Sequence, residues 1–257
     1  MSPQYENIRM EKSEGVARIT IDKPPLNVLD IKSLAEINSA LEDIKADPGI
    51  KVVVFAAAGR AFSAGVDVKD HLGDKVVEMI TTFNRMFRLM ASLEQPTLAV
   101  VGGAALGGGC EIAMFCDMVI ASEKASFGQP EIRVGVYPPL ACVSLPRVIG
   151  RKKALELILT GDTIDAQEAL RLGLVNHVVP TDSLEEEANK LVQKLATLSG
   201  PVLKLTKRAC FQGLDGDFEE VLSKVEDIYF NELMKTEDAN EGLQAFVEKR
   251  PPVWREK

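Results

Sequence analysis

The sequence has few residues that bind metal ions and no long apolar run. Four cysteines and two histidines are spread over 257 residues. No cysteine spacing is typical of a metal site, so we expect four reduced thiols, mostly packed inside: Cys110, Cys116, Cys142 and Cys210. No run reaches about 18 apolar residues, and no basic stretch precedes an apolar one at the N-terminus. We therefore expect a soluble, cytoplasmic protein without a membrane span.

Positive charge is also scarce. The chain has 30 Lys and Arg against 38 Asp and Glu, a net charge of -8. Nucleic acids and anionic membranes are bound by clustered Lys and Arg, and the most basic stretch, residues 204–208, has only three such residues. We therefore expect neither nucleic acid nor membrane as a partner, and an anionic ligand must be met by local cations.

Apolar strands and amphipathic helices alternate over the first 200 residues. Residues 16–22 alternate as a strand does, whereas three other runs are almost continuously apolar, which is typical of strands covered on both faces. These runs are residues 51–56, 97–101 and 118–121. Helices are predicted over residues 34–44 with Ser33 as N-cap, and over residues 154–159, 166–172 and 183–198. With 46% hydrophobic residues, the chain can bury a large core.

The region after Ser199 has helical patterns and no strand pattern. We therefore predict a core with the active site over residues 1–199 and a helical oligomerisation region over residues 200–257. Apolar positions such as Leu222 and Ile228 could not all be buried by a lone helical appendage. We expect a homotrimer or a homohexamer.

A glycine-rich corner at residues 102–109 is the most informative segment. It follows an apolar strand and is predicted to open a helix with Glu111 in its first turn, where backbone N–H groups lack intrahelical partners. Such a corner can hold an anion. A second carboxylate, Glu131, follows in a loop marked by glycine and proline, and two glutamates facing one pocket suggest acid and base catalysis.

Three other catalytic or nucleotide-binding motifs do not fit the sequence. A dinucleotide fingerprint fails because the third place is alanine whether the count starts at Gly102 or Gly103. A phosphate-binding Walker loop fails because Cys110, not Lys, follows the glycines. Ser63 lacks the flanking glycines of a nucleophile elbow, and His71 is interpreted as a loop or surface histidine.

A second glycine turn, residues 59–67, follows the strand over residues 51–56. Two strand-end loops with small residues can each supply a backbone N–H group to the same oxygen, which is an oxyanion hole. From the glycines alone, two ordinary structural turns remain the alternative.

These motifs resemble the enoyl-CoA hydratase/isomerase family, also called the crotonase family. The resemblance spans nearly the whole chain and rests on residues 61–67, 107–111, 116–117, 127–131, 145–150, 159–161, 173–175 and 245–250. It implies an α/β fold, a crotonase-like superhelix of strand-strand-helix turns with a C-terminal helical trimerisation region. It also implies an acyl-CoA substrate and no metal or separate cofactor, since coenzyme A is part of the substrate.

The resemblance assigns roles to individual residues. The backbone N–H groups of Val66 and Gly108 match the family's oxyanion hole. Glu111 and Glu131 match its paired acids, with Glu131 donating a proton to carbon and Glu111 activating water. Contacts with coenzyme A or the acyl group are expected from Pro25, Leu26, Val28, Phe62, Ala64, Asp67, Val68 and Tyr137, and from Phe230 and Lys249 of a neighbouring subunit. Core packing is the alternative for Phe230.

The reaction and the acyl group are inferred from the same resemblance. Isomerases, dehalogenases and decarboxylases of the family commonly change one or both acids, so two retained glutamates favour hydration or dehydration. Typical straight-chain hydratases carry a glycine run after the second glutamate, whereas this chain has bulky and proline residues over 135–144. With residues 24–31, this segment resembles the cyclic dienoyl-CoA hydratases of anaerobic aromatic degradation, which convert cyclohexa-1,5-diene-1-carbonyl-CoA to 6-hydroxycyclohex-1-ene-1-carbonyl-CoA.

Two alternatives to this assignment remain. The first is a straight-chain enoyl-CoA hydratase of fatty-acid β-oxidation. The second, of another class, is an RNA-binding or inert acyl-CoA-binding homologue. A basic stripe would favour RNA binding.

Overall fold

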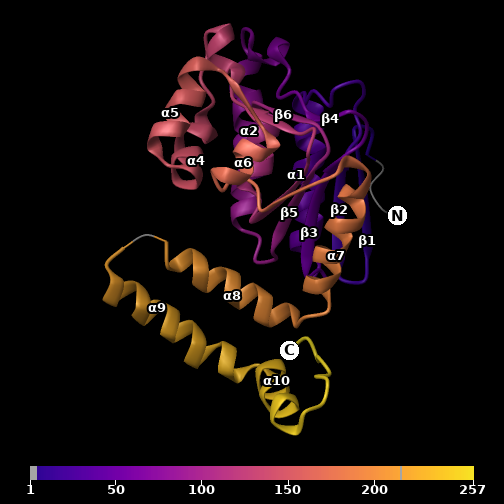
Figure 1. Cartoon of the computed structure of the whole chain (residues 1–257), viewed down its shortest axis with the longest axis vertical. Helices are drawn as coiled ribbons and strands as arrows, with labels where there is room; N and C mark the ends of the chain where they lie inside the picture. The colour runs from indigo at the N-terminus through magenta and orange to yellow at the C-terminus, as the bar shows by residue number, and fades with distance from the viewer. Residues whose placement is uncertain (1–4, 215) are drawn as a thin grey trace.

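The computed structural model describes residues 5–214 and 216–257, in which strands and helices alternate up to α7 and only helices follow (Figure 1). The strands are β1 (Ile8–Ser13), β2 (Val16–Ile21), β3 (Val52–Ala57), β4 (Ala61–Ser63), β5 (Thr97–Val101), β6 (Ala104–Leu106), β7 (Met118–Ser122), β8 (Ser126–Gly128), β9 (Thr163–Asp165) and β10 (His177–Val179). The α-helices are α1 (Ile31–Lys45), α2 (Lys75–Ala91), α3 (Gly108–Phe115), α4 (Pro139–Ile149), α5 (Arg151–Thr160), α6 (Ala166–Arg171), α7 (Leu184–Ala196), α8 (Gly200–Gln212), α9 (Phe218–Asn231) and α10 (Glu237–Glu248). Short 3-10 turns are η1 (Val68–His71), η2 (Pro130–Val134), η3 (Thr181–Ser183) and η4 (Leu233–Lys235).

Two sheets form the core. The larger has the order β1-β2-β3-β5-β7-β10, with β1 antiparallel to β2 and the other pairs parallel. The smaller has the order β4-β6-β8-β9, with only β9 antiparallel to its neighbour in the described chain. Three times, a long strand is followed by a short strand and then a helix: β3-β4-α2, β5-β6-α3 and β7-β8-α4. The predicted α/β superhelix of strand-strand-helix turns is confirmed.

The central strands are buried on both faces, as their apolar sequences predict. On one face, Val53 and Phe55 of β3 belong to the cluster that includes α1, α2 and α3. On the other face, Val52 and Val54 pack in the cluster that includes α7. Full burial of one large apolar side chain in such a strand stabilises the folded protein by roughly 1.5–3 kcal/mol. The short strands β4, β6 and β8 follow directly after the buried strands β3, β5 and β7.

The helix N-cap and the short strands differ from the sequence-based predictions. Asp30 caps α1, because its side chain accepts hydrogen bonds from the Ser33 N–H (2.9 Å) and hydroxyl (2.6 Å). Ser33 is not the cap and lies buried in the first turn. Strands β4, β6, β8, β9 and β10 have three residues each, too few for an alternating pattern. Strand β1 was also missed.

Two cysteines lie outside the core, contrary to the expectation of mostly packed thiols. All four are free, but Cys142 and Cys210 are exposed, whereas Cys110 and Cys116 are buried. Burial raises the pKa of the Cys110 thiol to about 12, so this thiol stays protonated near neutral pH. His71, expected in a loop or at the surface, ends η1 and is half-buried.

Helices α8, α9 and α10 lie below the sheets in Figure 1, away from β4 and β6. Ser199 caps α8, which begins where the boundary at residue 200 was predicted. The Lys207 ammonium joins α8 to the core, because it pairs with Asp117 at 2.8 Å and donates to the Gln95 carbonyl oxygen at 2.9 Å. The division into two regions stays a prediction. Within residues 5–214 and 216–257, no helix combines the length and the apolar character needed to cross a membrane.

Candidate active site

The glycine run 107–109 brings three segments together at the start of α3. A Cβ on the first glycine would collide with Glu131 Oε1. On the second it would lie 2.9 Å from the Val66 side chain, and on the third 2.5 Å from the Ser63 carbonyl oxygen. The first glycine also has φ 51°, which favours glycine over all other residues. The run therefore lets one helix start contact a second loop and a carboxylate at once.

Val66 and Gly108 present backbone donors from adjacent segments. Leu29 pairs with Val66 in a parallel bridge, in which the Leu29 N–H donates to Gly65 O and the Asp67 N–H donates to Leu29 O, both at 2.9 Å. Such pairing points the Val66 N–H away from Leu29, and this donor has no protein acceptor in the described chain. The Gly108 N–H is the first of α3 and lacks an intrahelical partner. A Cβ on Gly65 would lie 3.5 Å from the Gly108 nitrogen.

Glu111 lies in the first turn of α3 as predicted, and its side chain is only 2% exposed. Its Oε1 accepts a hydrogen bond from the Ala141 N–H at 2.8 Å. Pro138 and Pro139, which open α4, carry no N–H, so the first free donors of that turn come after them. Burial raises the pKa of Glu111 to about 8, opposed by the Ala141 hydrogen bond and assisted by the negative charge of Glu131. The Glu111 carboxyl group is therefore held by the N-terminus of α4, although the residue itself belongs to α3.

Glu131 lies in η2 and faces the start of α3. Its Oε1 lies against Gly107, and its Oε2 is buried without a hydrogen-bond partner among the described residues. Burial raises the pKa of Glu131 as well. The structure thus brings Glu111 and Glu131 together at one corner. Burial raises the pKa of both carboxyl groups, and the charge of Glu131 adds to the raised pKa of Glu111, so the two titrate as a coupled pair that can provide one acid and one base.

The predicted coenzyme A contacts on the core form two adjoining segments, residues 25–28 and 62–68. The Ala64 N–H donates to the Leu26 carbonyl oxygen at 2.9 Å, which ties these segments together. The Phe62 ring is 1% exposed and packs in the core, so only its backbone groups are available for the predicted contact, which stays a prediction. The exposed or half-buried members are Pro25, Leu26, Val28, Ala64, Asp67 and Val68.

The remaining predicted contacts lie at the surface. Tyr137, just before α4, is 67% exposed. Phe230 on α9 is 63% exposed, so the alternative of core packing is wrong for the single chain. Lys249 ends α10 and is exposed. In Figure 1, α9 and α10, whose ends carry these two residues, lie well apart from β4 and β6, the short strands next to the glycine corner. Their contact from a neighbouring subunit stays a prediction.

Several residues at this corner were not found from the sequence. The backbone N–H of Ala141 holds Glu111, and a backbone donor leaves no signal in residue type. Gln129 is fully buried two residues before Glu131, and neither polar atom of its side chain has a partner in the described ranges. Cys142 is exposed next to Ala141, and partial desolvation of its thiol, together with the charges of the two glutamates, raises the pKa of the thiol. Asn27, discussed below, joins the two substrate loops.

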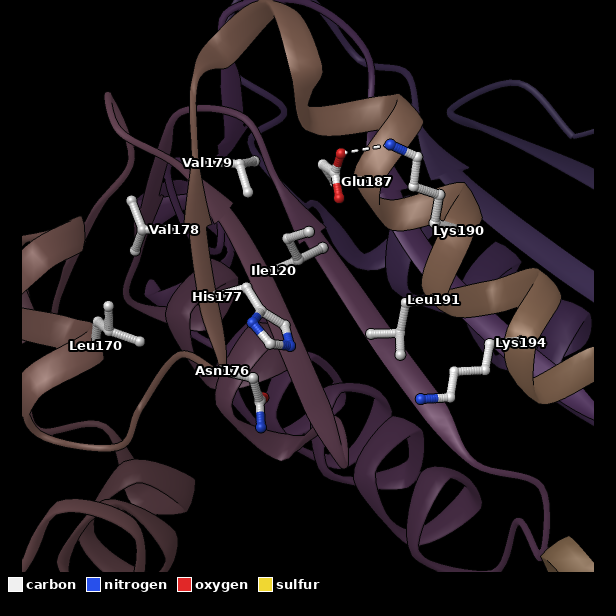
Figure 2. Close-up of a pocket in the computed structure, with 10 residues that line it drawn as sticks. All are labelled: Ile120, Leu170, Asn176, His177, Val178, Val179, Glu187, Lys190, Leu191 and Lys194. Atoms are coloured by element: carbon white, nitrogen blue, oxygen red, sulfur yellow. Dashed lines mark hydrogen bonds and ion pairs between the residues drawn. The ribbon is translucent and has the colours of Figure 1, made fainter.

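A groove elsewhere on the core has a volume of about 410 Å³ (Figure 2). It lies between β7, β10 and α7, with Ile120 and Leu191 among its apolar side chains. His177 and Lys194 also line it, and Lys190 pairs with Glu187 at 2.7 Å (Figure 2). It contains neither glutamate of the glycine corner. The candidate site is therefore the corner and not this groove.

Comparison with known proteins identifies the family of the chain. Residues 11–257 match the family described as Enoyl-CoA hydratase/isomerase. A probable enoyl-CoA hydratase of Rhizobium meliloti is 42% identical over 249 residues, covering 96% of both chains. A crotonyl-CoA hydratase of Syntrophomonas wolfei is 36% identical over 252 residues, again covering 96% of both.

Solved structures agree as well. The crystal structure of an enoyl-CoA hydratase from Bacillus anthracis superposes with a TM-score of 0.93 at 34% identity, over 98% of this chain and 100% of the other. The match thus includes both sheets, the glycine corner and the C-terminal helices. The chain belongs to the enoyl-CoA hydratase/isomerase family.

Proposed function

We propose that the protein adds water across the double bond of an α,β-unsaturated acyl-CoA, using Glu111, Glu131 and the N–H groups of Val66 and Gly108. The observation that carries this proposal is the meeting of a buried acid, a half-buried acid and two free backbone donors at one glycine corner. Conjugate addition places negative charge on the thioester oxygen. Preorganised donors stabilise such charge by about 3 kcal/mol each. The proposed step uses neither a metal nor a redox cofactor, because hydration involves no net oxidation or reduction and the two N–H groups stabilise the charge. Coenzyme A is part of the substrate.

The two carboxyl groups supply the proton transfers. Water loses a proton to the pair as its oxygen bonds to the β-carbon, and the pair returns a proton to carbon, so its proton count is unchanged. In a simple enoyl thioester the proton goes to the α-carbon. In the cyclic dienoyl thioester it goes to the far end of the conjugated system, which leaves a double bond at the α-carbon of the product. Glu111, fixed by the Ala141 N–H, orients and activates the water. Glu131, whose Oε2 has no partner among the described residues, delivers the proton to carbon. The shared proton passes between the two groups through the water.

The direct test is hydration of crotonyl-CoA, monitored by the loss of the ultraviolet absorbance of the conjugated thioester, and of cyclohexa-1,5-diene-1-carbonyl-CoA, monitored by chromatography of the product. The expected result is turnover without an added metal or cofactor. Binding of both esters with turnover of neither would support the inert homologue instead. A salt-sensitive RNA gel shift together with no turnover would support the RNA-binding alternative.

The acyl group of the proposed substrate is the alicyclic dienoyl ring of cyclohexa-1,5-diene-1-carbonyl-CoA. Pro138 is buried and Pro139 half-buried at the start of α4, beside Tyr137 and on the element that holds Glu111. Proline fixes the backbone, and a stiff wall can orient a flat ring against the two acids. A short straight chain is the second candidate, because the Syntrophomonas wolfei relative is named crotonyl-CoA hydratase.

A comparison of kcat/KM for the two thioesters shows which acyl group the protein prefers. We expect a higher kcat/KM for the cyclic dienoyl-CoA than for crotonyl-CoA in one buffer, since this ratio measures discrimination between transition states. A preference for crotonyl-CoA of tenfold or more, about 1.4 kcal/mol, would contradict the ring and favour the straight-chain hydratase.

Self-association into trimers or hexamers is the expected assembly. Ile228 is buried, but Leu222 is 38% exposed, and large apolar side chains crowd the C-terminal helices. The most exposed are Phe218 (72%), Phe230 (63%), Phe246 (84%) and Val247 (79%). Apolar surface of this extent marks a protein interface. Phe230 and Lys249 would then reach the coenzyme A of a neighbouring subunit.

Light scattering should give three or six times the 28.0 kDa mass of the chain. Phe246→Asp, which places a charge in this surface, should lower the measured mass. A stable and active monomer of the unaltered protein would contradict the assembly and remove the role expected of Phe230 and Lys249.

A further inference from the structure

Asn27 lies buried between the two segments expected to bind substrate. It is 2% exposed and has φ 54°, a conformation that asparagine tolerates better than most residues. Its Nδ2 donates to the carbonyl oxygens of Ala58 (2.9 Å) and Ala61 (2.8 Å), and its Oδ1 accepts from the Lys23 N–H (2.8 Å). One amide side chain therefore ties the turn at residues 23–27 to the turn between β3 and β4.

The backbone of Asn27 continues this connection toward Val66. Its carbonyl oxygen accepts a hydrogen bond from the Ser63 hydroxyl at 2.7 Å, and Ser63 Oγ in turn accepts from the Gly65 N–H at 3.1 Å. Ser63 is fully buried, so these bonds are shielded from water. The next contact along the chain is the parallel bridge between Val66 and Leu29. The peptide of Val66 is thus held from both ends.

We propose that Asn27 is a positioning residue that sets the direction of the Val66 N–H toward the oxygen shared with Gly108. This inference rests on the proposed function, because it gives that N–H the role of an oxyanion donor. Such a donor acts through direction and distance, and small displacements cost large factors in rate. A displaced donor therefore lowers kcat and the polarisation of the bound carbonyl more than it lowers affinity.

Two substitutions separate the side chain from the backbone conformation. Asn27→Gly keeps the positive φ and removes the hydrogen bonds, whereas Asn27→Asp keeps the size and the Oδ1 acceptor but removes the donor. Each should lower kcat about 10- to 100-fold and change KM less than about threefold. Asn38→Ala is the matched control, because Asn38 is also 2% exposed and donates to the Thr82 carbonyl oxygen, outside the two substrate loops. It should lower stability and leave kcat near that of the unaltered protein.

A spectroscopic readout distinguishes positioning from a general loss of structure. Polarisation of the carbonyl shifts the absorption of a conjugated dienoyl thioester to longer wavelength. Bound 2,4-hexadienoyl-CoA should show this shift in Glu111→Gln, where its hydration is slow enough for the spectrum to be recorded first. The shift should be smaller when Asn27→Gly is added, with a similar Kd.

The outcomes separate this inference from the proposed function. An active unaltered protein whose Asn27→Gly variant keeps kcat and the full spectral shift would overturn the inference alone. If the Asn27 variants do not fold, Ser63→Ala decides by the same measurements, since it removes the hydroxyl that links Asn27 to Gly65. An unaltered protein that hydrates no enoyl-CoA would overturn the proposed function, and the inference with it.

Discussion

Glu111→Gln and Glu131→Gln are each expected to lower kcat for hydration by about 10²- to 10⁴-fold, the range of general acid and base catalysis. Glutamine keeps the size and the hydrogen-bonding oxygen, so the Ala141 N–H can still donate to residue 111. It cannot exchange a proton with water or carbon. Because the acids act on the transition state, the Kd for a saturated acyl-CoA should change little. Stopped-flow kinetics and calorimetric binding measure the two quantities.

Near-normal turnover in either variant would contradict the two-acid mechanism. The pH dependence of stability checks that Glu111→Gln is folded. The pKa of Glu111 is raised in the folded protein to about 8, so the unfolded chain releases this proton at lower pH. Protonated Glu111 therefore makes its full contribution to the stability of the folded protein below about pH 4, and this contribution is lost as pH rises toward 8. Glu111→Gln should consequently be more stable than the unaltered protein at pH 8, and the difference should shrink at pH 5.

Gly107→Ala is expected to lower kcat at least 100-fold and to destabilise the fold. The residue has φ 51° and ψ -125°, which an alanine adopts only with strain of about 1–3 kcal/mol. A Cβ here would also collide with Glu131 Oε1. The carboxyl group must then move away from the substrate, and the start of α3 must shift with it. Steady-state kinetics and thermal unfolding report the two effects.

Gly173→Ala is the matched control for this prediction. Gly173 also has positive φ (78°), but a Cβ there would meet no atom within 4 Å. The Gly173→Ala variant should be destabilised by backbone strain, as Gly107→Ala is, but should keep its kcat. If Gly107→Ala retains full activity, the contact between Gly107 and Glu131 does not position the acid.

The sequence determined the α/β layers, because burial dictates residue type along whole strands and helices. Runs such as residues 97–101 are apolar on both faces, and they form the strands that helices cover on both sides. Short strands such as β6 were missed, since three residues carry no periodicity. The N-cap of α1 was misplaced by three residues, from Asp30 to Ser33, because both residue types favour that position.

The sequence also supplied the two glutamates and the glycines, but only the tertiary structure decided how they meet. Glu111 and Glu131 lie twenty positions apart and come together because β6 and β8 are neighbours in the small sheet. The donor that fixes Glu111 comes from the start of α4, and Asn27 reaches across two turns. Residue type records how strongly a position is buried and which backbone angles it adopts. The direction of a backbone N–H and the partner of a carboxylate depend on contacts between distant segments, which no local pattern contains.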